Sequence, residues 1–139
     1  MILIVTTLIL HGCAKSSIIQ TLKNENLKLQ KSGAPIRLIY TELKRGGVVF
    51  KRALLGQVHL SIAGNILKQD TLLAILKHGR FKEVSLFQTR AVKRDFRSNL
   101  VQEVWVIKNN RNHKYAYLVT YAFPKEGGTD IYLSAGYRI

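Results

Sequence analysis

The sequence predicts an α+β fold in which N-terminal helices pack on a four-stranded antiparallel meander. Apolar residues recur at helical spacing before residue 80, and four segments rich in β-branched and aromatic residues follow residue 81. The segments between these four are short enough to join neighbouring antiparallel strands. The chain has 139 residues, close to the commonest domain size. We therefore expect residues 36–139 to form a single basic α+β domain.

An apolar run opens the chain. Residues 1–10 read MILIVTTLIL and carry no charge, but they are too few to cross a bilayer core, which takes about 20 residues. The run fits the apolar region of an export signal. The alternative is a buried strand over residues 2–10, because pattern alone does not distinguish the two. The next residues, HGCAKSS, fail the phosphate-loop pattern, so nucleotide binding is set aside.

The run ends in Leu10-His11-Gly12-Cys13, which resembles the lipobox of bacterial lipoproteins. The resemblance implies that residues 1–12 are a signal segment that is cut off, and that the Cys13 thiol receives a diacylglyceryl group. The new amino terminus can also be acylated, for example with palmitate. Ala14 in place of Asp implies retention at the outer membrane, facing the periplasm. Since Cys13 is the only cysteine, no intramolecular disulfide is expected.

Residues 13–35 are predicted to be a lipid-anchored helix or spacer. Within them, the apolar spacing of residues 16–31 predicts an amphipathic helix with Ser16 or Ser17 as its N-cap, and a solvated tether is the alternative. Residues 36–43 are apolar but ambiguous in type.

A strand and a second helix are expected next. The strand covers residues 58–62, whereas residues 52–55 fit a helical turn as well as a strand. Leucines at helical spacing within residues 63–79 predict the helix, with Asp70 near its start and a left-handed Gly79 just beyond its last turn.

The predicted meander consists of residues 84–92, 100–108, 115–123 and 131–137. In its third strand, alternation places Tyr115, Tyr117 and Tyr121 on one face and small residues on the other. The small residues suit close packing of a helix. We interpret the tyrosines as packing residues, with a platform that stacks nucleic-acid bases as the alternative.

The chain is strongly basic, with 22 Lys and Arg against 8 Asp and Glu and a net charge of +14. Such an excess predicts an anionic partner. The densest basic run is Arg90, Lys93, Arg94 and Arg97. Arginine offers a bidentate fork to phosphate, so this run is a candidate anion site. The alternative is that a hairpin turn simply carries solvated charges.

The sequence predicts neither catalysis nor a metal or cofactor. Its four histidines show no ligand spacing, its eight carboxylates are scattered, and it lacks a G-x-S-x-G motif. We therefore expect a non-catalytic, lipid-anchored envelope protein whose basic periplasmic domain binds an anionic or protein partner, as an accessory or assembly subunit of an envelope machine. The alternative is a soluble nucleic-acid-binding domain that uses the basic run and the tyrosine-rich strand.

Overall fold

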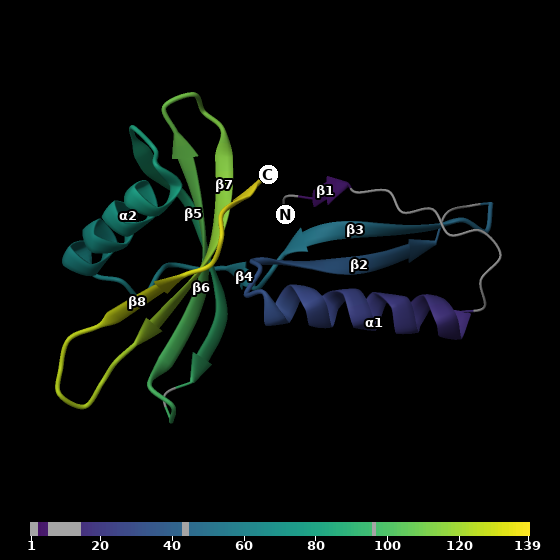
Figure 1. Cartoon of the computed structure of the whole chain (residues 1–139), viewed down its shortest axis with the longest axis horizontal. Coiled ribbons are helices and arrows are strands. Elements are labelled where there is room, and N and C mark those ends of the chain that lie inside the picture. Colours follow the sequence, from purple (N-terminus) through teal and green to yellow (C-terminus); the bar gives the residue numbers. More distant parts are fainter. Residues whose placement is uncertain (1–2, 6–14, 43–44, 96) are drawn as a thin grey trace. The chain divides into compact units, whose positions relative to one another are not determined.

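The computed structural model describes residues 3–5, 15–42, 45–95 and 97–139. Its internal contacts divide the chain into two compact units, Met1–Leu54 (unit 1) and Leu55–Ile139 (unit 2). Figure 1 shows a helix and antiparallel strands in each unit, which confirms the α+β class. The predicted domain over residues 36–139 thus spans parts of both units.

Unit 1 is one helix with a three-stranded antiparallel sheet. Its elements are β1 (Leu3–Val5), α1 (Lys15–Lys31), β2 (Ile36–Glu42) and β3 (Val48–Leu54), with strand order β1-β3-β2. α1 confirms the helix predicted over residues 16–31, but it begins at Lys15, so the predicted N-cap at Ser16 or Ser17 is wrong. Residues 36–42 of the ambiguous segment form a strand. Within the opening apolar run, β1 pairs with β3 so that Leu3 lies opposite Ala53. Residues 6–14 are outside the described part of the chain.

Helix α1 is held to its sheet by apolar contacts and by one amide side chain. Ile18 is buried against Val48 and Phe50 of β3. Asn26 forms two hydrogen bonds with the backbone of Leu38, because its Nδ2 donates to the carbonyl (3.0 Å) and its Oδ1 accepts from the amide (2.7 Å). Asn26 therefore pairs with the outer edge of β2 as a neighbouring strand would.

Unit 2 is a six-stranded antiparallel sheet with one helix. Its elements are β4 (Gln57–Val58), α2 (Asn65–Gly79), β5 (Val84–Asp95), β6 (Leu100–Asn109), β7 (Lys114–Ala122), β8 (Asp130–Leu133) and β9 (Tyr137–Arg138). The strand order is β4-β5-β6-β7-β8, and β9 also pairs with β7. The predicted four-stranded meander with several helices is therefore wrong in detail. β4 adds an edge strand, the last predicted strand is broken in two, and α2 is the one described helix of this unit.

The break between β8 and β9 has a local cause. The Ser134 hydroxyl accepts a hydrogen bond from the Leu118 amide (2.9 Å), in place of a backbone carbonyl. A Cβ atom on Gly136 would overlap the ring of Tyr117, so this position has room only for glycine. The edge strand is thus interrupted where the Tyr117 side chain passes under it.

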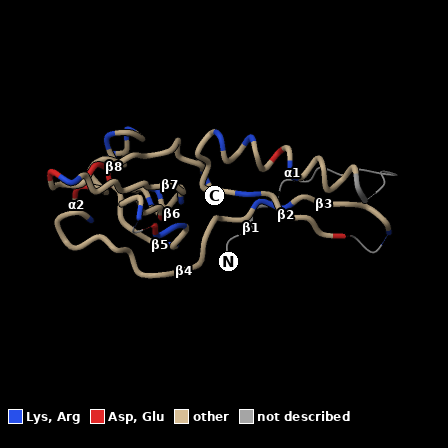
Figure 2. The backbone as a smooth tube through the Cα atoms, turned by 90° about the horizontal axis from the view of Figure 1, so that it is seen from below, with Lys and Arg blue, Asp and Glu red and all other residues tan. Residues whose placement is uncertain are grey.

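The strand predicted over residues 58–62 is wrong beyond Val58. Instead of continuing along β5, the chain turns so that the Ser61 hydroxyl (2.7 Å) and the Ile62 amide (2.8 Å) donate to the carboxylate of Glu103. Figure 2 shows the chain around β4 as a run without charged residues. The Glu103 carboxylate therefore sets the path of the chain into α2.

Helix α2 begins at Asn65, so its first turn contains no acidic residue and Asp70 does not lie near its start as predicted. Its end is also one residue later than predicted. The left-handed residue is Arg80 (φ 52°), not Gly79. Gly79 is required for another reason, since a Cβ there would overlap the ring of Phe81. The Phe81 amide donates to the Leu76 carbonyl (3.0 Å), which closes the helix end.

The core of unit 2 lies between α2 and the tyrosine face of the sheet. Ile75 of α2 is fully buried with Trp105, Tyr117 and Tyr121. Thr71 Oγ1 lies 2.7 Å from the Tyr121 hydroxyl. The helix thus covers the tyrosines rather than the small residues of the opposite face, because the broad aromatic rings supply more apolar area to bury.

Candidate functional site

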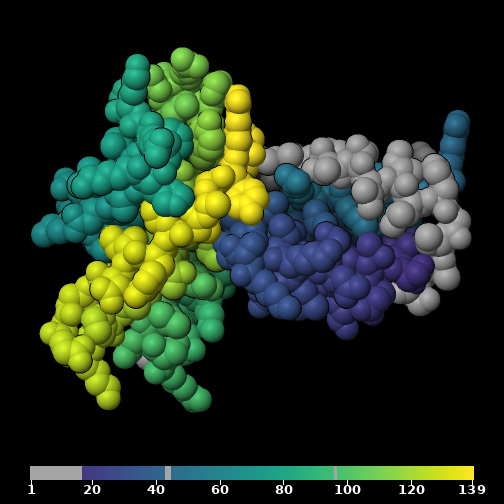
Figure 3. All heavy atoms as spheres, in the orientation of Figure 1, coloured from purple at the N-terminus to yellow at the C-terminus, as the bar shows by residue number. Residues whose placement is uncertain are grey.

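A basic pocket of about 410 Å³ lies at one end of the six-stranded sheet. Three segments line it: the turn that follows α2, the β6–β7 turn, and the C-terminal strand β9. Its lining residues are Gly79, Arg80, Phe81, Lys82, Asn109, Asn110, Arg111, His113, Tyr115 and Arg138. Figure 3 shows these teal, green and yellow segments together at the upper end of unit 2.

The β6–β7 turn is fixed by Asn109. Its Oδ1 accepts hydrogen bonds from the amides of Arg111 (3.0 Å) and His113 (2.9 Å). Asn112 has a left-handed backbone (φ 59°), which asparagine tolerates better than most residues. The side chain of Arg111 is therefore presented from an ordered turn.

The opposite wall of the pocket is built by α2 and β9. The left-handed Arg80 turns the chain back toward the sheet, and the rings of Phe81 and Tyr115 pack 5.0 Å apart at 59°. Arg138 pairs with Tyr115 across the strands. The aromatic pair thus supplies an apolar part of the pocket lining.

Four cations surround this pocket: Arg80, Lys82, Arg111 and Arg138. Neither Asp nor Glu is among the described residues that line it, and none of the four cations forms an ion pair within the described ranges. Like charges gathered in this way repel one another unless an anion lies between them. Arginine forks and a lysine ammonium are the groups that bind phosphate oxygens. The arrangement suits a phosphate-type anion.

The pocket was missed by the sequence-based search because its cations are far apart in the chain. The four cations come from two turns and a terminal strand, so they form no dense local run in the sequence. An antiparallel meander brings alternate turns to the same end of the sheet, so the predicted strand boundaries contained the signal needed to find it.

Arg90, a predicted anion-binding residue, is directed at the protein's own backbone. It is 6% exposed, and its guanidinium donates to the carbonyls of Leu55 (2.9 Å) and Gly56 (2.7 Å). Burial lowers the pKa of Arg90 from its ordinary value. Gly56 has φ 73°, and a Cβ there would overlap the Ala91 carbonyl. Arg90 therefore secures the tight turn that precedes β4.

The other three predicted anion-binding residues do not converge on one point. Arg94 Nη2 lies 3.0 Å from His59 Nδ1 and donates to the Leu60 carbonyl (3.2 Å). Lys93 and Arg97 are exposed, and Lys93 is 4.0 Å from a carboxylate oxygen of Asp95. The basic run is thus divided between one residue that braces a loop and two that face solvent.

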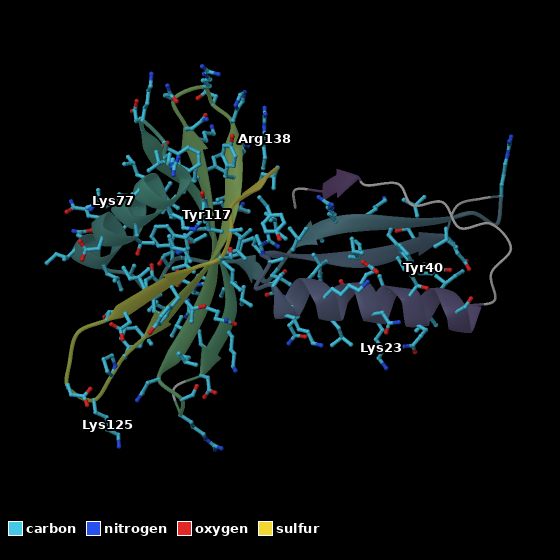
Figure 4. All side chains as sticks on the ribbon, viewed as in Figure 1. Lys23, Tyr40, Lys77, Tyr117, Lys125 and Arg138 are labelled. Atoms are coloured by element: carbon cyan, nitrogen blue, oxygen red, sulfur yellow. The ribbon has the colours of Figure 1, made fainter. Side chains whose placement is uncertain are left out.

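The tyrosine candidates are mostly in the core. Tyr117 is 2% exposed and Tyr121 is fully buried, whereas Tyr115 is partly buried beside the pocket. Figure 4 shows Tyr117 at the centre of unit 2. The rings of Tyr117 and Tyr121 are therefore occupied by packing, and Tyr115 remains near the candidate site.

Alkaline pH is expected to destabilise unit 2 through Tyr121. Burial raises the pKa of this hydroxyl far above its ordinary value of 10.0, and the nearby Glu103 charge adds to the rise. The unfolded chain then releases the proton at lower pH than the folded chain does. The Tyr121 hydroxyl therefore leaves the free energy of unfolding unchanged below pH 10. Above pH 10 it lowers that free energy by up to about 1.4 kcal/mol per pH unit.

Urea unfolding of Tyr121→Phe between pH 9 and 11.5 measures this effect. We expect the variant to lose stability less steeply with pH than the wild type. Tyr132→Phe, at a 58% exposed position, is the matched control and should keep the wild-type slope. Equal slopes for the two variants would contradict the assignment.

The remaining predicted site residue, Cys13, lies outside the described residues. Where the structure describes the chain, no helix is long and apolar enough to cross a membrane. In the same ranges, no three His, Cys, Asp or Glu side chains gather closely enough to hold a metal ion.

Comparison with other proteins adds no further constraint on the candidate site. No family model, curated protein or solved structure matches the chain.

Proposed function

We propose that this chain is a non-catalytic, lipid-anchored protein of the bacterial cell envelope, whose basic unit 2 binds a phosphate-bearing partner. The observation that carries the proposal is the pocket with four cations and no ion pair among its described lining residues. Phosphate groups on lipopolysaccharide and on phospholipid headgroups have the chemistry that these residues recognise. Binding of this kind suits an accessory or assembly subunit of an envelope machine.

The lipid anchor rests on Cys13 and the lipobox-like residues before it. One acyl chain holds a protein weakly, so the several chains implied by a lipobox provide the stable attachment. Basic residues that reach an anionic membrane surface add about 1 kcal/mol each. Cleavage of the chain before Cys13 removes β1. The contacts that hold α1 to β2 and β3 do not involve β1, so cleavage leaves them in place.

Cys13→Ser tests the anchor. In a bacterial host, the wild type is expected in the membrane fraction, with a mass for residues 13–139 plus acyl chains, because the thiol is the acceptor. The variant should lack the acyl mass and leave that fraction. Wild-type protein that keeps residues 1–12 and carries no acyl group would contradict the proposal.

The alternative, a soluble nucleic-acid-binding domain, receives less support. Two of the three tyrosines of its stacking platform, Tyr117 and Tyr121, are buried under α2, and Tyr115 is partly buried. Of its four phosphate-contacting residues, Arg90 is bound to backbone carbonyls and Arg94 to the Leu60 carbonyl, whereas Lys93 and Arg97 are exposed. Oligonucleotide affinity that falls steeply with added salt would favour this alternative.

A further inference from the structure

A stretch of unit 2 without charged residues carries several exposed aliphatic side chains. Residues 55–67 contain no Lys, Arg, Asp or Glu, in a chain of which 22% is charged. The exposed aliphatic side chains of this stretch are Val58 (60% exposed), Leu60 (85%), Ile62 (38%) and Ile66 (78%). We call these four residues the apolar loop. All four lie within nine consecutive residues, and exposed apolar side chains gathered on a surface mark a contact with a protein or a membrane.

The backbone of the apolar loop is bound to the sheet. The His59 amide donates to the Thr89 carbonyl (3.1 Å), and the Thr89 hydroxyl donates to the His59 carbonyl (2.5 Å). The Ile62 amide donates to Glu103, and Arg94 donates to the Leu60 carbonyl. Inserting backbone into hydrocarbon is costly when its polar groups are unpaired. In the apolar loop the side chains are exposed while several backbone amides and carbonyls already have hydrogen-bond partners. The cost of placing this backbone in an apolar phase is therefore reduced.

The charges around the apolar loop are mostly basic. Arg94 donates to the Leu60 carbonyl, and Lys68 follows Ile66 by two residues on α2. Lys93 is exposed on the adjacent strand, where its ammonium lies 4.0 Å from a carboxylate oxygen of Asp95. The nearest acidic residue along α2 is Asp70, which lies one turn after Ile66 and beyond the apolar loop. Aliphatic side chains with basic neighbours complement a bilayer that contains anionic headgroups.

We propose that the apolar loop inserts into the surface of a membrane that contains anionic lipid. Leu60 and Ile66 enter the boundary between headgroups and acyl chains, while Arg94 and Lys93 contact lipid phosphates. This contact is separate from the lipid on Cys13 and from the basic pocket, so it requires neither. A protein that docks on the same side chains is the competing explanation, and the experiment below distinguishes the two.

Cys13 is the only cysteine, so a Cys13→Ser background allows a single probe to be placed anywhere in the full chain. We would introduce Leu60→Cys and Ile66→Cys separately and label each with a fluorophore that brightens in an apolar environment. Ile19→Cys is the matched control, since Ile19 is 60% exposed on α1 in unit 1. Vesicles of phosphatidylcholine alone are compared with vesicles that also contain phosphatidylglycerol.

With phosphatidylglycerol vesicles, emission at positions 60 and 66 should shift to the blue and rise several-fold, and the probe at position 19 should not change. Lys93→Gln should weaken the response at position 60, because a rim cation is lost while Arg94 keeps its hydrogen bond to the Leu60 carbonyl. An unchanged spectrum at both loop positions would overturn the proposal and leave a docking protein as the occupant. An equal response to both vesicle types would overturn the role of anionic lipid.

Discussion

Glu103→Ala is expected to lower the free energy of unfolding of unit 2 by about 3–5 kcal/mol. The carboxylate is 1% exposed and accepts three hydrogen bonds. Their donors are the Ser61 hydroxyl (2.7 Å), the Ile62 amide (2.8 Å) and the Trp105 indole (2.8 Å). Alanine leaves all three donors unpaired in a site that water reaches poorly, and each such loss costs about 1–3 kcal/mol.

Trp105 provides the measurement. It is the only tryptophan, is fully buried, and donates directly to Glu103, so its fluorescence in urea reports the unfolding of unit 2. Glu126→Ala, at an exposed position, is the matched control and should change stability by less than about 0.5 kcal/mol. A loss below about 1 kcal/mol for Glu103→Ala would show that this carboxylate does not hold the connection into α2.

Glu103→Gln separates charge from shape. Glutamine fills the same space, but its amide nitrogen cannot accept from a donor that faces it. We expect Glu103→Gln to lower the free energy of unfolding, but by less than Glu103→Ala does. Equal losses for Glu103→Gln and Glu103→Ala would mean that both carboxylate oxygens are indispensable acceptors.

Arg111→Gln and Arg138→Gln are each expected to weaken binding of inorganic pyrophosphate by about tenfold at low salt. Both side chains lie at the pocket, and neither forms an ion pair among the described residues, so their charge is available to an anion. Calorimetric titration of the full chain measures the affinity. Added salt should reduce the difference between wild type and variants, because exposed charges are screened.

Two substitutions control for the general positive charge. Lys125→Gln and Arg97→Gln remove the same charge from exposed positions that do not line the pocket. Figure 4 shows Lys125 at the end of unit 2 opposite Arg138. We expect less than a twofold change for either. If all four variants weaken binding equally, the net charge and not the pocket attracts the anion.

The strands of the C-terminal half were predictable because their residue types and their turns agree. The predicted segments 84–92, 100–108 and 115–123 match β5, β6 and β7 closely. The last predicted strand failed at Gly136, where the Tyr117 ring displaces the chain from a regular ladder. That conflict depends on a contact between two strands, and local pattern does not contain it.

The roles of individual charged residues were much less predictable. Glu103 counted only as one of eight scattered carboxylates, because its partners Ser61 and Ile62 lie about 40 positions away. Arg90 belonged to the densest basic run, yet its place beside the turn at Gly56 follows from the pairing of β4 with β5. Hydrogen bonds between distant segments decide these roles. The assignment of Cys13 as the acylated residue stays a prediction from the sequence.

An NMR titration of the isotope-labelled full chain with inorganic pyrophosphate tests the binding pocket most directly. Because the ligand is expected to lie among the four cations, amide shifts should concentrate in residues 79–82 and 109–113 and at Arg138. Amides around Arg97 and Lys125 should stay in place. Shifts spread evenly over basic residues of both units, or none at all, would contradict the proposal that this pocket is the anion-binding site.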